Sequence, residues 1–285
     1  MKLLTLNTHS LIEGRGAEQA SVLAKAILAE QFDVVALQEV NQECNAKPLG
    51  KHAMEYFAQC SEDVPVREGN FAYEVMKCLF SSGVCYYGGY LPVKKGYGKY
   101  DEGLAFLCRS PMVAWESAPL SLGRSYDDWK TRSMLAVRCE GRTDWFFNLH
   151  LGWWDDMEEP FVAQWKRLLP HLLEKDRYWL MGDFNNPAEV RGEGYDLLCE
   201  SGLFDAYEMA CRRRGCGTAR AKIDGWCGRK MAYDWLRIDQ IFCNQSRPVV
   251  CYETLFDGKN YSEISDHLGV AVTVSENNET ERGEA

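Results

Sequence analysis

Polar residues that could bind a metal or move a proton recur where apolar runs of the sequence begin or end. They form six motifs: Asn7, Gln38-Glu39, Asn148-x-His150, Gly182-Asp183-Phe184-Asn185, Arg237-x-Asp239 and Ser265-Asp266-His267. Taken singly, each motif is an ordinary turn or loop start, because Asp, Asn and Ser side chains bond nearby backbone. Turn formation alone does not account for all of them together. Residues at strand ends converge on one rim of a sheet, so the pattern predicts a shared site.

Oxygen donors and imidazoles dominate this set. The carboxylate and amide members are hard oxygen ligands, which favour Mg²⁺ or Mn²⁺ over zinc. These candidates are Asn7, Glu39, Asp183, Asn185 and Asp266. The imidazoles of His150 and His267 can act as general acids or bases, or donate to a phosphate oxygen. Together they predict phosphoryl transfer to water, in which charge develops on the phosphate oxygens.

The elements that must position these residues are mostly strands. The sequence predicts a strand over residues 2–8, a helix over 17–30, where apolar residues recur at helical spacing, and a buried strand over 33–40. These three elements together form a βαβ unit. Further predicted strands cover 103–109, 134–139, 145–151, 178–183, 237–243 and 268–274, and a second helix covers 161–174. Many strands with few helices predict a sheet-rich α+β body of stacked layers.

The composition is that of a globular protein. The chain has 285 residues, 46% of them hydrophobic and 26% charged, which excludes disorder as its main state. A chain of this length buries enough surface to need no disulfide staples. Neither a repeat nor a linker divides it, so we expect a single domain over residues 1–275. The polar stretch 276–285 is expected to be a disordered tail.

Charge and cysteine usage restrict the partners and the compartment. The formal net charge of −10 disfavours a nucleic-acid partner, which needs a broad basic surface. The 12 cysteines include no Cys-x-x-Cys pair, which argues against a zinc ribbon. The first apolar run is too short for a signal peptide, and no run is long enough to span a membrane. We therefore expect a cytoplasmic protein with reduced thiols and no membrane partner.

In their order and spacing, the six motifs resemble those of the endonuclease/exonuclease/phosphatase superfamily, the fold of deoxyribonuclease I. The resemblance covers nearly the whole chain. It implies a four-layered α/β sandwich in which two packed mixed β-sheets are flanked by helices. It also implies a metal-dependent hydrolase that cleaves phosphate ester bonds with Mg²⁺ or Mn²⁺ as its cofactor.

The resemblance implies a metal-binding side to the site. Glu39 matches the main Mg²⁺ ligand, with Asn7 and Asp266 in support. Asp183 and Asn185 match residues that position or deprotonate the attacking water, or that hold a second metal. The full set of candidate metal ligands is Asn7, Glu39, Asp183, Asn185, Asp266 and His267.

The resemblance also implies catalytic partners for the phosphate. His267, oriented by Asp266, and His150 match residues that contact the scissile phosphate. Asp239 is expected to hold one of these two histidines in the correct tautomer. Glu102 falls where some relatives pair a carboxylate with the histidine that matches His150.

Substrate choice is expected to come from rim loops. Arg132, in Lys130-Thr131-Arg132, falls where relatives place a phosphate-binding arginine, and a bidentate guanidinium suits that task. Aromatic residues of the loops can either stack on a substrate ring or pack the loops themselves. The aromatic candidates are Tyr97, Tyr100, Trp153, Trp154 and Trp226, of which Trp153 and Trp226 are the predicted substrate-binding pair. These loops resemble those of bacterial sugar-phosphate phosphatases of the maltose 6'-phosphate phosphatase type.

The function favoured by the sequence is a Mg²⁺-dependent phosphomonoesterase acting on a small phosphorylated metabolite such as a sugar phosphate. The alternative is a DNA or RNA phosphodiesterase. A sphingomyelinase-like phospholipase is less favoured, because no apolar membrane hairpin is evident. A non-catalytic binding module is disfavoured because every metal and histidine position is filled.

Overall fold

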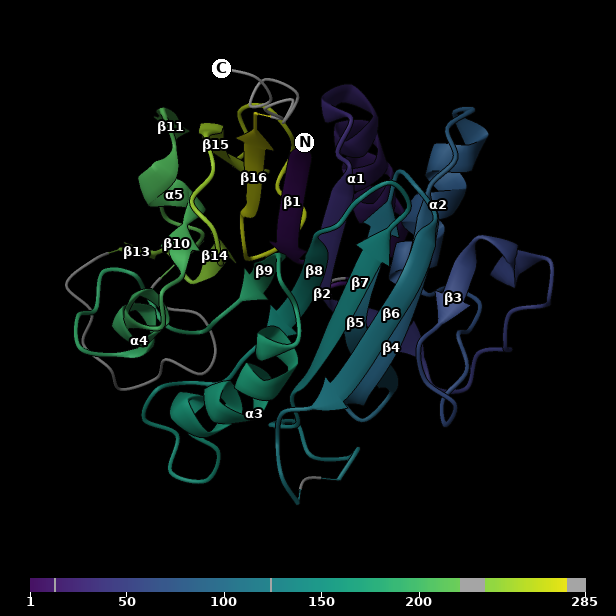
Figure 1. Ribbon diagram of the computed structural model, residues 1–285. Helices are drawn as coiled ribbons and strands as arrows, with labels where there is room; N and C mark the ends of the chain where they lie inside the picture. Colours follow the sequence, from purple (N-terminus) through teal and green to yellow (C-terminus); the bar gives the residue numbers. More distant parts are fainter. Residues whose placement is uncertain (13, 124, 221–233, 276–285) are drawn as a thin grey trace.

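Two large β-sheets packed face to face form the centre of the computed structural model, which describes residues 1–12, 14–123, 125–220 and 234–275 (Figure 1). The eight strands of the larger sheet are, in spatial order, β11 (Arg212–Arg214), β15 (Val249–Leu255), β16 (Gly269–Val274), β1 (Lys2–Asn7), β2 (Val34–Glu43), β5 (Tyr100–Cys108), β4 (Tyr87–Gly96) and β3 (Phe57–Gln59). The six strands of the smaller sheet are β10 (Phe204–Asp205), β14 (Asp239–Cys243), β9 (Tyr178–Asp183), β8 (Trp145–His150), β7 (Ser133–Cys139) and β6 (Met112–Pro119).

Both large sheets are mixed. Strands β1 and β2 run parallel in the larger sheet, as β8 and β9 do in the smaller one, and most other neighbours are antiparallel. A third, two-stranded sheet pairs β12 (Ala219–Arg220) with β13 (Trp235–Leu236). The helices are α1 (Gly16–Glu30), the 3₁₀ turn η1 (Ala53–Glu55), α2 (Phe71–Ser81), α3 (Phe161–Leu173), α4 (Gly194–Glu200) and α5 (Ala206–Met209).

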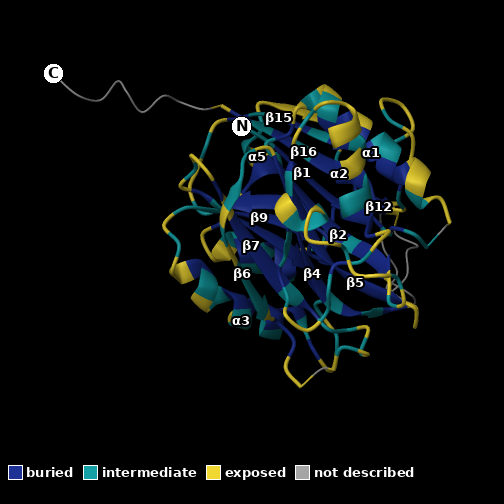
Figure 2. Cartoon of the chain, turned by 90° about the vertical axis from the view of Figure 1, so that its right-hand side faces the viewer, coloured by how far each residue is buried: buried dark blue, intermediate teal, exposed yellow. Residues whose placement is uncertain are grey.

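Three hydrophobic cores separate four layers. The first core joins α1 and α2 to the outer face of the larger sheet, for example Leu23 and Leu79 against Leu107. The second lies between the two sheets and includes Phe106 and Trp179. The third joins α3 and α4 to the smaller sheet, and Figure 2 shows how the buried residues concentrate in the sheets. The predicted four-layered sandwich is therefore confirmed.

The predicted βαβ opening is present, because β1, α1 and β2 follow in order and β1 pairs with β2 from Leu3↔Val34 to Asn7↔Gln38. Each of the other predicted strands and the predicted helix 161–174 also has a counterpart in the fold. Strands β4, β6 and β15 and helix α2 were not predicted, and neither were the short elements β3, β10, β11, β12, β13, η1, α4 and α5. Residues 94–100 were predicted as a loop, whereas they are the end of β4 and the turn into β5.

Some predicted features lie at positions that the structure does not describe. Trp226 and the tail at 276–285 lie outside the described residues, and the single domain over residues 1–275 stays a prediction. Within the described ranges, no helix combines the length and the hydropathy that crossing a lipid bilayer requires.

Candidate active site

Three neighbouring strands of the smaller sheet place His150, Asp183 and Asp239 in one row. The parallel pairing of β8 with β9 sets His150 opposite Asp183. The antiparallel pairing of β9 with β14 sets Asp239 opposite the same Asp183. Directly opposed residues on adjacent strands project from the same face of a sheet. Residues almost ninety positions apart in the sequence are therefore brought side by side by strand register alone.

The larger sheet contributes Asn7 from the end of β1 and Glu39 from the middle of β2. The pairing of β2 with β5 shifts register between Leu37 and Val40, and Glu39 within this irregularity has a φ of 48°. Such bulges re-aim a side chain, and a positive φ in a residue other than glycine is uncommon. Asn7 Nδ2 lies 3.0 Å from Glu39 Oε1 and 3.1 Å from Asp183 Oδ2, so this amide joins the two sheets.

The Gly-Asp-x-Asn motif forms a turn that also holds the carboxylate of Asp183. Gly182 has a φ of 151°, and a Cβ there would lie 1.9 Å from the carbonyl oxygen of Leu149. A side chain at this position would therefore separate β9 from β8. Asn185 donates its backbone N–H to Asp183 Oδ1 over 2.9 Å and its side-chain Nδ2 to the carbonyl oxygen of Leu151 over 2.9 Å. The turn thereby fixes the position of Asp183.

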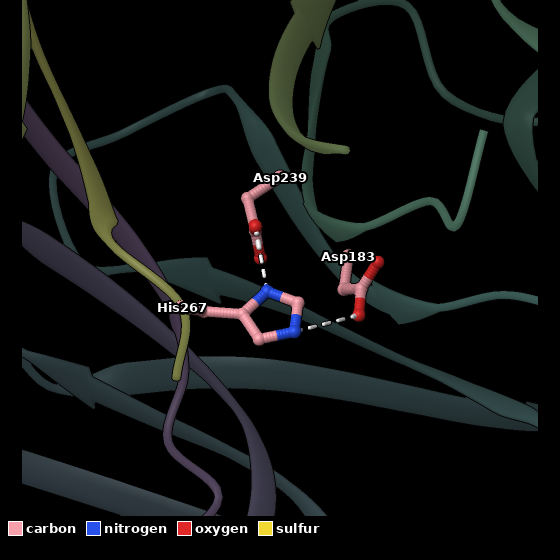
Figure 3. Close-up of side chains that lie close together, drawn as sticks. All are labelled: Asp183, Asp239 and His267. Atoms are coloured by element: carbon pink, nitrogen blue, oxygen red, sulfur yellow. Dashed lines mark hydrogen bonds and ion pairs between the residues drawn. The ribbon is translucent and has the colours of Figure 1, made fainter. Parts of the chain in front are cut away.

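His267 is oriented by Asp239. Its Nδ1 lies 2.8 Å from Asp239 Oδ2, and its Nε2 lies 4.0 Å from Asp183 Oδ2 (Figure 3). The structure does not give Asp266 the orienting contact that the resemblance implies, because His267 Nδ1 is engaged by Asp239. The Asp266 side chain is 42% exposed, and its Oδ1 lies 3.4 Å from Nδ1 of His9.

Glu102 and His150 do not form the pair that the resemblance implies. Glu102 Oε1 lies 3.1 Å from Nζ of Lys94. Among the described residues, the carboxylates within ion-pair distance of His150 Nε2 are Asp183 at 3.6 Å and Glu39 at 3.9 Å. Glu102 still faces the same cavity as His150. Its partner is a lysine because β4 lies next to β5 in the larger sheet.

The buried carboxylates fit a divalent cation. Burial raises the pKa of Glu39, and the nearby Glu102 raises it further. Burial also raises the pKa of Asp183 to about 7, with Asp239 adding to the effect. Like charges gathered out of water are unfavourable unless a cation accompanies them, and carboxylate oxygens are the ligands that Mg²⁺ and Mn²⁺ prefer. Asn7 is placed with its Nδ2 toward these carboxylates, so it would have to rotate its amide to act as a ligand.

A second grouping of potential ligand atoms involves Asp183 together with Asp239 and His267. One atom each of Asp183, Asp239 and His267 falls within 4.8 Å of the others, and all three residues are buried. His267 Nδ1 is already engaged with Asp239. The pair is therefore better placed to orient an imidazole than to hold an ion, and Asp183 is shared by both groupings.

The two histidines have different charges at neutral pH. Burial lowers the pKa of His150 well below its usual value, and the neighbouring cations Arg132 and Lys94 lower it further. Burial would lower the pKa of His267 as well, but Asp239 and other carboxylates raise it to about 10. His150 is thus a neutral imidazole, whereas His267 is an imidazolium that can donate two hydrogen bonds.

A cavity of about 430 Å³ opens above these groups. The predicted site residues that line it are Glu39, Glu102, Arg132, His150, Trp153, Asp183, Asn185, Asp266 and His267. Asn7 and Asp239 stand behind this lining and bond to it. The cavity has the size that a small ligand needs.

The cavity wall includes residues that the sequence analysis did not assign to the site, namely His9, Lys94 and Trp129. Each lies within three positions of a predicted site residue or in a predicted rim segment. This nearness in the sequence was the one feature that could have identified them as site residues. Trp129, three residues before Arg132, has 55% of its surface exposed and lies 5.8 Å from the ring of Trp153.

The aromatic candidates divide between the cavity and the packing of the loops. Tyr97 and Trp153 line the cavity. Trp154 instead packs on Phe161 at 6.4 Å between ring centroids, and the buried Tyr100 donates its hydroxyl to the carbonyl oxygen of Leu11. Trp226 lies among the residues that the structure does not describe.

Comparison with known proteins places this geometry in a broad group. The model of the endonuclease/exonuclease/phosphatase family matches residues 4–267. An endonuclease/exonuclease/phosphatase family protein from Leptotrichia buccalis C-1013-b has 29% identity and a TM-score of 0.83, and the match covers 96% of this chain and 99% of that one. No curated protein sequence matches the chain.

Two more distant solved structures share the fold. A mannosyl-6-phosphatase from Bacteroides thetaiotaomicron VPI-5482 has 21% identity and a TM-score of 0.63, with 96% of this chain and 99% of that chain covered. A humanized TDP2 from D. rerio has 18% identity and a TM-score of 0.58, with 96% and 98% covered. At these identities the likeness concerns the fold and leaves the substrate open.

Proposed function

Because the chain belongs to the endonuclease/exonuclease/phosphatase family, whose members hydrolyse phosphate esters, we propose that it is a Mg²⁺- or Mn²⁺-dependent phosphomonoesterase. Its substrate is a small phosphorylated metabolite such as a sugar phosphate. The observation that carries the proposal is the cavity of about 430 Å³, which places buried carboxylates and imidazoles opposite buried cations. The similarity to a mannosyl-6-phosphatase agrees with a sugar phosphate.

Glu39, with Asn7 and Asp266, would hold the cation. When bound, the cation polarises the phosphate and neutralises part of its charge. Glu39 is the central member because its side chain is 20% exposed and bonded to Asn7, whereas the Asp266 side chain is 42% exposed.

The residues of the smaller sheet would handle the water and the phosphate. Asp183, with a pKa raised to about 7, is suited to accept the proton of the attacking water at Oδ2. Asn185 holds the other oxygen of Asp183 and keeps this carboxylate in place. The imidazolium of His267, held by Asp239, would donate from Nε2 to a phosphate oxygen as negative charge develops there.

Arg132 and Trp153 would form the substrate wall. The Arg132 guanidinium lies 5.8 Å from the centre of the Trp153 ring, within the range of a cation–π contact. A guanidinium fork matches two phosphate oxygens. His150, neutral beside Asp183 and Glu39, can accept or donate one hydrogen bond at the same edge of the cavity.

An activity screen with Mg²⁺ tests the proposal. Purified protein is incubated with sugar phosphates, nucleotides, plasmid DNA and short-chain phospholipids, and phosphate release and plasmid nicking are measured. We expect release from at least one sugar phosphate to exceed nicking by a wide margin. Faster cleavage of DNA would contradict the phosphomonoesterase and favour a nucleic-acid phosphodiesterase.

Variants connect any activity to the site. Glu39→Gln and His267→Ala should each lower kcat by about 10²–10³-fold or more, as the loss of a preorganised electrostatic group does. Lys25→Gln, on the exposed face of α1, is the matched control and should keep wild-type rates. Wild-type rates in both site variants would refute the assignment.

A further inference from the structure

Two cationic side chains lie buried next to each other in the cavity wall. Lys94, near the end of β4, is 8% exposed, and Arg132, just before β7, is 3% exposed. Both donate to the same carbonyl oxygen of Trp129, Lys94 Nζ over 2.8 Å and Arg132 Nη1 over 3.3 Å. Burying two like charges together is unfavourable unless something of opposite charge accompanies them.

Carboxylates of Glu39, Glu102 and Asp183 line the same cavity, but among the described residues none of them is in direct contact with Arg132. Within the described part of the chain, the one carboxylate at ion-pair distance from either cation is Glu102, 3.1 Å from Lys94 Nζ. The second bond of Arg132 Nη1 is to the carbonyl oxygen of Thr131 over 3.4 Å, and the buried Arg132 Nε has no partner among the described residues. An unpartnered buried N–H is costly, so this wall is built for an anionic ligand.

The amount of charge discriminates between ester classes. A phosphate monoester carries between one and two negative charges near neutral pH, because its second pKa is about 6. A phosphodiester carries one. We propose that Lys94, together with Arg132, recognises the second negative charge of a terminal phosphate and is thus a specificity-determining residue for monoesters over diesters. This inference rests on the proposed function, because it concerns the same site.

A pair of substrates with one leaving group isolates this effect. We would measure kcat/KM for p-nitrophenyl phosphate and for methyl p-nitrophenyl phosphate, which differ by one negative charge. Lys94→Gln should lower kcat/KM for the monoester by about 100-fold, the loss typical of one preorganised donor, and change the diester far less. Lys94→Arg should recover part of the monoester activity.

Lys95 offers a matched control one position along the same strand. Successive strand residues point to opposite faces, and the Lys95 side chain is 39% exposed with Asp127 as its partner at 3.7 Å. Lys95→Gln removes the same charge from the same strand outside the cavity. It should leave the ratio of the two kcat/KM values unchanged.

The partner Glu102 requires a second variant, because Lys94→Gln alone leaves this buried carboxylate unpaired. The double variant Lys94→Gln/Glu102→Gln removes both charges and keeps the hydrogen-bonding groups. It should fold, as circular dichroism can verify, and should lack the monoester preference. Calorimetric titration of inorganic phosphate in Mg²⁺ buffer gives a readout besides turnover. Lys94→Gln and the double variant should each bind phosphate at least about tenfold more weakly than the wild type.

The outcomes separate the two proposals. Equal losses on both esters in Lys94→Gln, or a preserved monoester preference and wild-type phosphate affinity in the double variant, would overturn the role of Lys94 and leave the phosphomonoesterase standing. A wild-type protein that cleaves the diester faster than the monoester would overturn the proposed function itself.

Discussion

His150 and His267 lie near the same carboxylate oxygen, Asp183 Oδ2, yet they carry different charges. His150 Nε2 is 3.6 Å from this oxygen and His267 Nε2 is 4.0 Å from it. The difference arises from what lies behind each ring: buried cations lower the pKa of His150, whereas Asp239 raises the pKa of His267. At the residue scale, Asp239 is therefore the positioning residue on which the charge of the site depends.

Replacement of Asp239 by Asn tests this dependence. Asn keeps the size of the side chain but removes the charge, so kcat should fall about 10–100-fold, as for other groups that orient a ligand or catalytic histidine. KM should change little. In the metal-free protein, an NMR titration should show the His267 ring losing its proton well below the wild-type value of about 10.

Asp127→Asn, at a carboxylate that is 77% exposed and pairs with Lys95, is the control for Asp239→Asn and should alter neither quantity. An unchanged kcat together with an unshifted titration in Asp239→Asn would show that the ring is oriented by something else.

At the scale of elements, two buried amides connect the sheets beneath the site. Gln38 on β2 donates from Nε2 to Asn148 Oδ1 over 2.6 Å. Asn148 on β8 donates from Nδ2 to the carbonyl oxygens of Leu37 and Ala105 over 2.9 and 2.8 Å. Both belong to motifs that predicted catalytic residues, yet they face the interior, and their neighbours Glu39 and His150 face the cavity.

Asn148→Ala should therefore destabilise the fold. It removes the side-chain donor of two buried backbone carbonyls and leaves the Gln38 amide with Thr5 as its remaining side-chain partner, and each such loss costs about 1–3 kcal/mol. We expect the free energy of unfolding, measured in urea, to drop by about 3 kcal/mol or more. Asn260→Ala, at an exposed amide, should change it by less than about 0.5 kcal/mol. A similarly small change for Asn148→Ala would show that the bridge is dispensable.

Strands with a continuous apolar run could be predicted from the sequence, and those governed by packing could not. Strand β4 contains Gly88, Gly89 and Pro92, which indicate turns when seen locally. In the fold, a Cβ on Gly88 would lie 2.3 Å from the Phe57 ring and one on Gly89 2.9 Å from Met112, so these glycines make room for distant side chains. Strand β6 was missed because it is a half-exposed edge strand with a weak apolar pattern.

The members of the site could likewise be predicted, but not their pairing. The motifs identify the segments that meet at the site, because so many polar residues beside apolar runs exceed what turns alone require. Which carboxylate faces His267 depends on how the segment before β16 packs against β14 of the other sheet, which local patterns do not contain. Lys94 and Trp129 were not assigned for the same reason, since their contact crosses from β4 to the segment before β7.

At the scale of the whole molecule, the formal charge of −10 is partly concentrated in the site. Glu39, Glu102, Asp183 and Asp266 all line one cavity. Carboxylates held together in the folded state repel one another there more than in the unfolded chain. A bound cation would therefore stabilise the native molecule as well as the proposed reaction.

Mg²⁺ should raise the melting temperature accordingly. At a free concentration of about 100 times Kd, binding adds roughly 2.7 kcal/mol, which for a protein of this size corresponds to about 5–10 °C. Excess EDTA should reverse the shift in a thermal melt. Glu39→Gln should no longer respond to Mg²⁺, and its metal-free form should melt above the metal-free wild type because one buried charge is gone. If neither Mg²⁺ nor Mn²⁺ changed the melting temperature of the wild-type protein, the cation site would be ruled out.

The amide of Asn7 touches a carboxylate from each sheet, Glu39 on one side and Asp183 on the other. The separation between Glu39, the proposed cation ligand, and Asp183, the proposed water-activating group, therefore depends on the apolar layer that holds the two sheets about 10 Å apart. The packing of the interior therefore sets the distance between the side chains that meet at its edge. A methylene gained or lost deep in the sandwich, far from any substrate, would be transmitted to the site as a misalignment of the reacting groups.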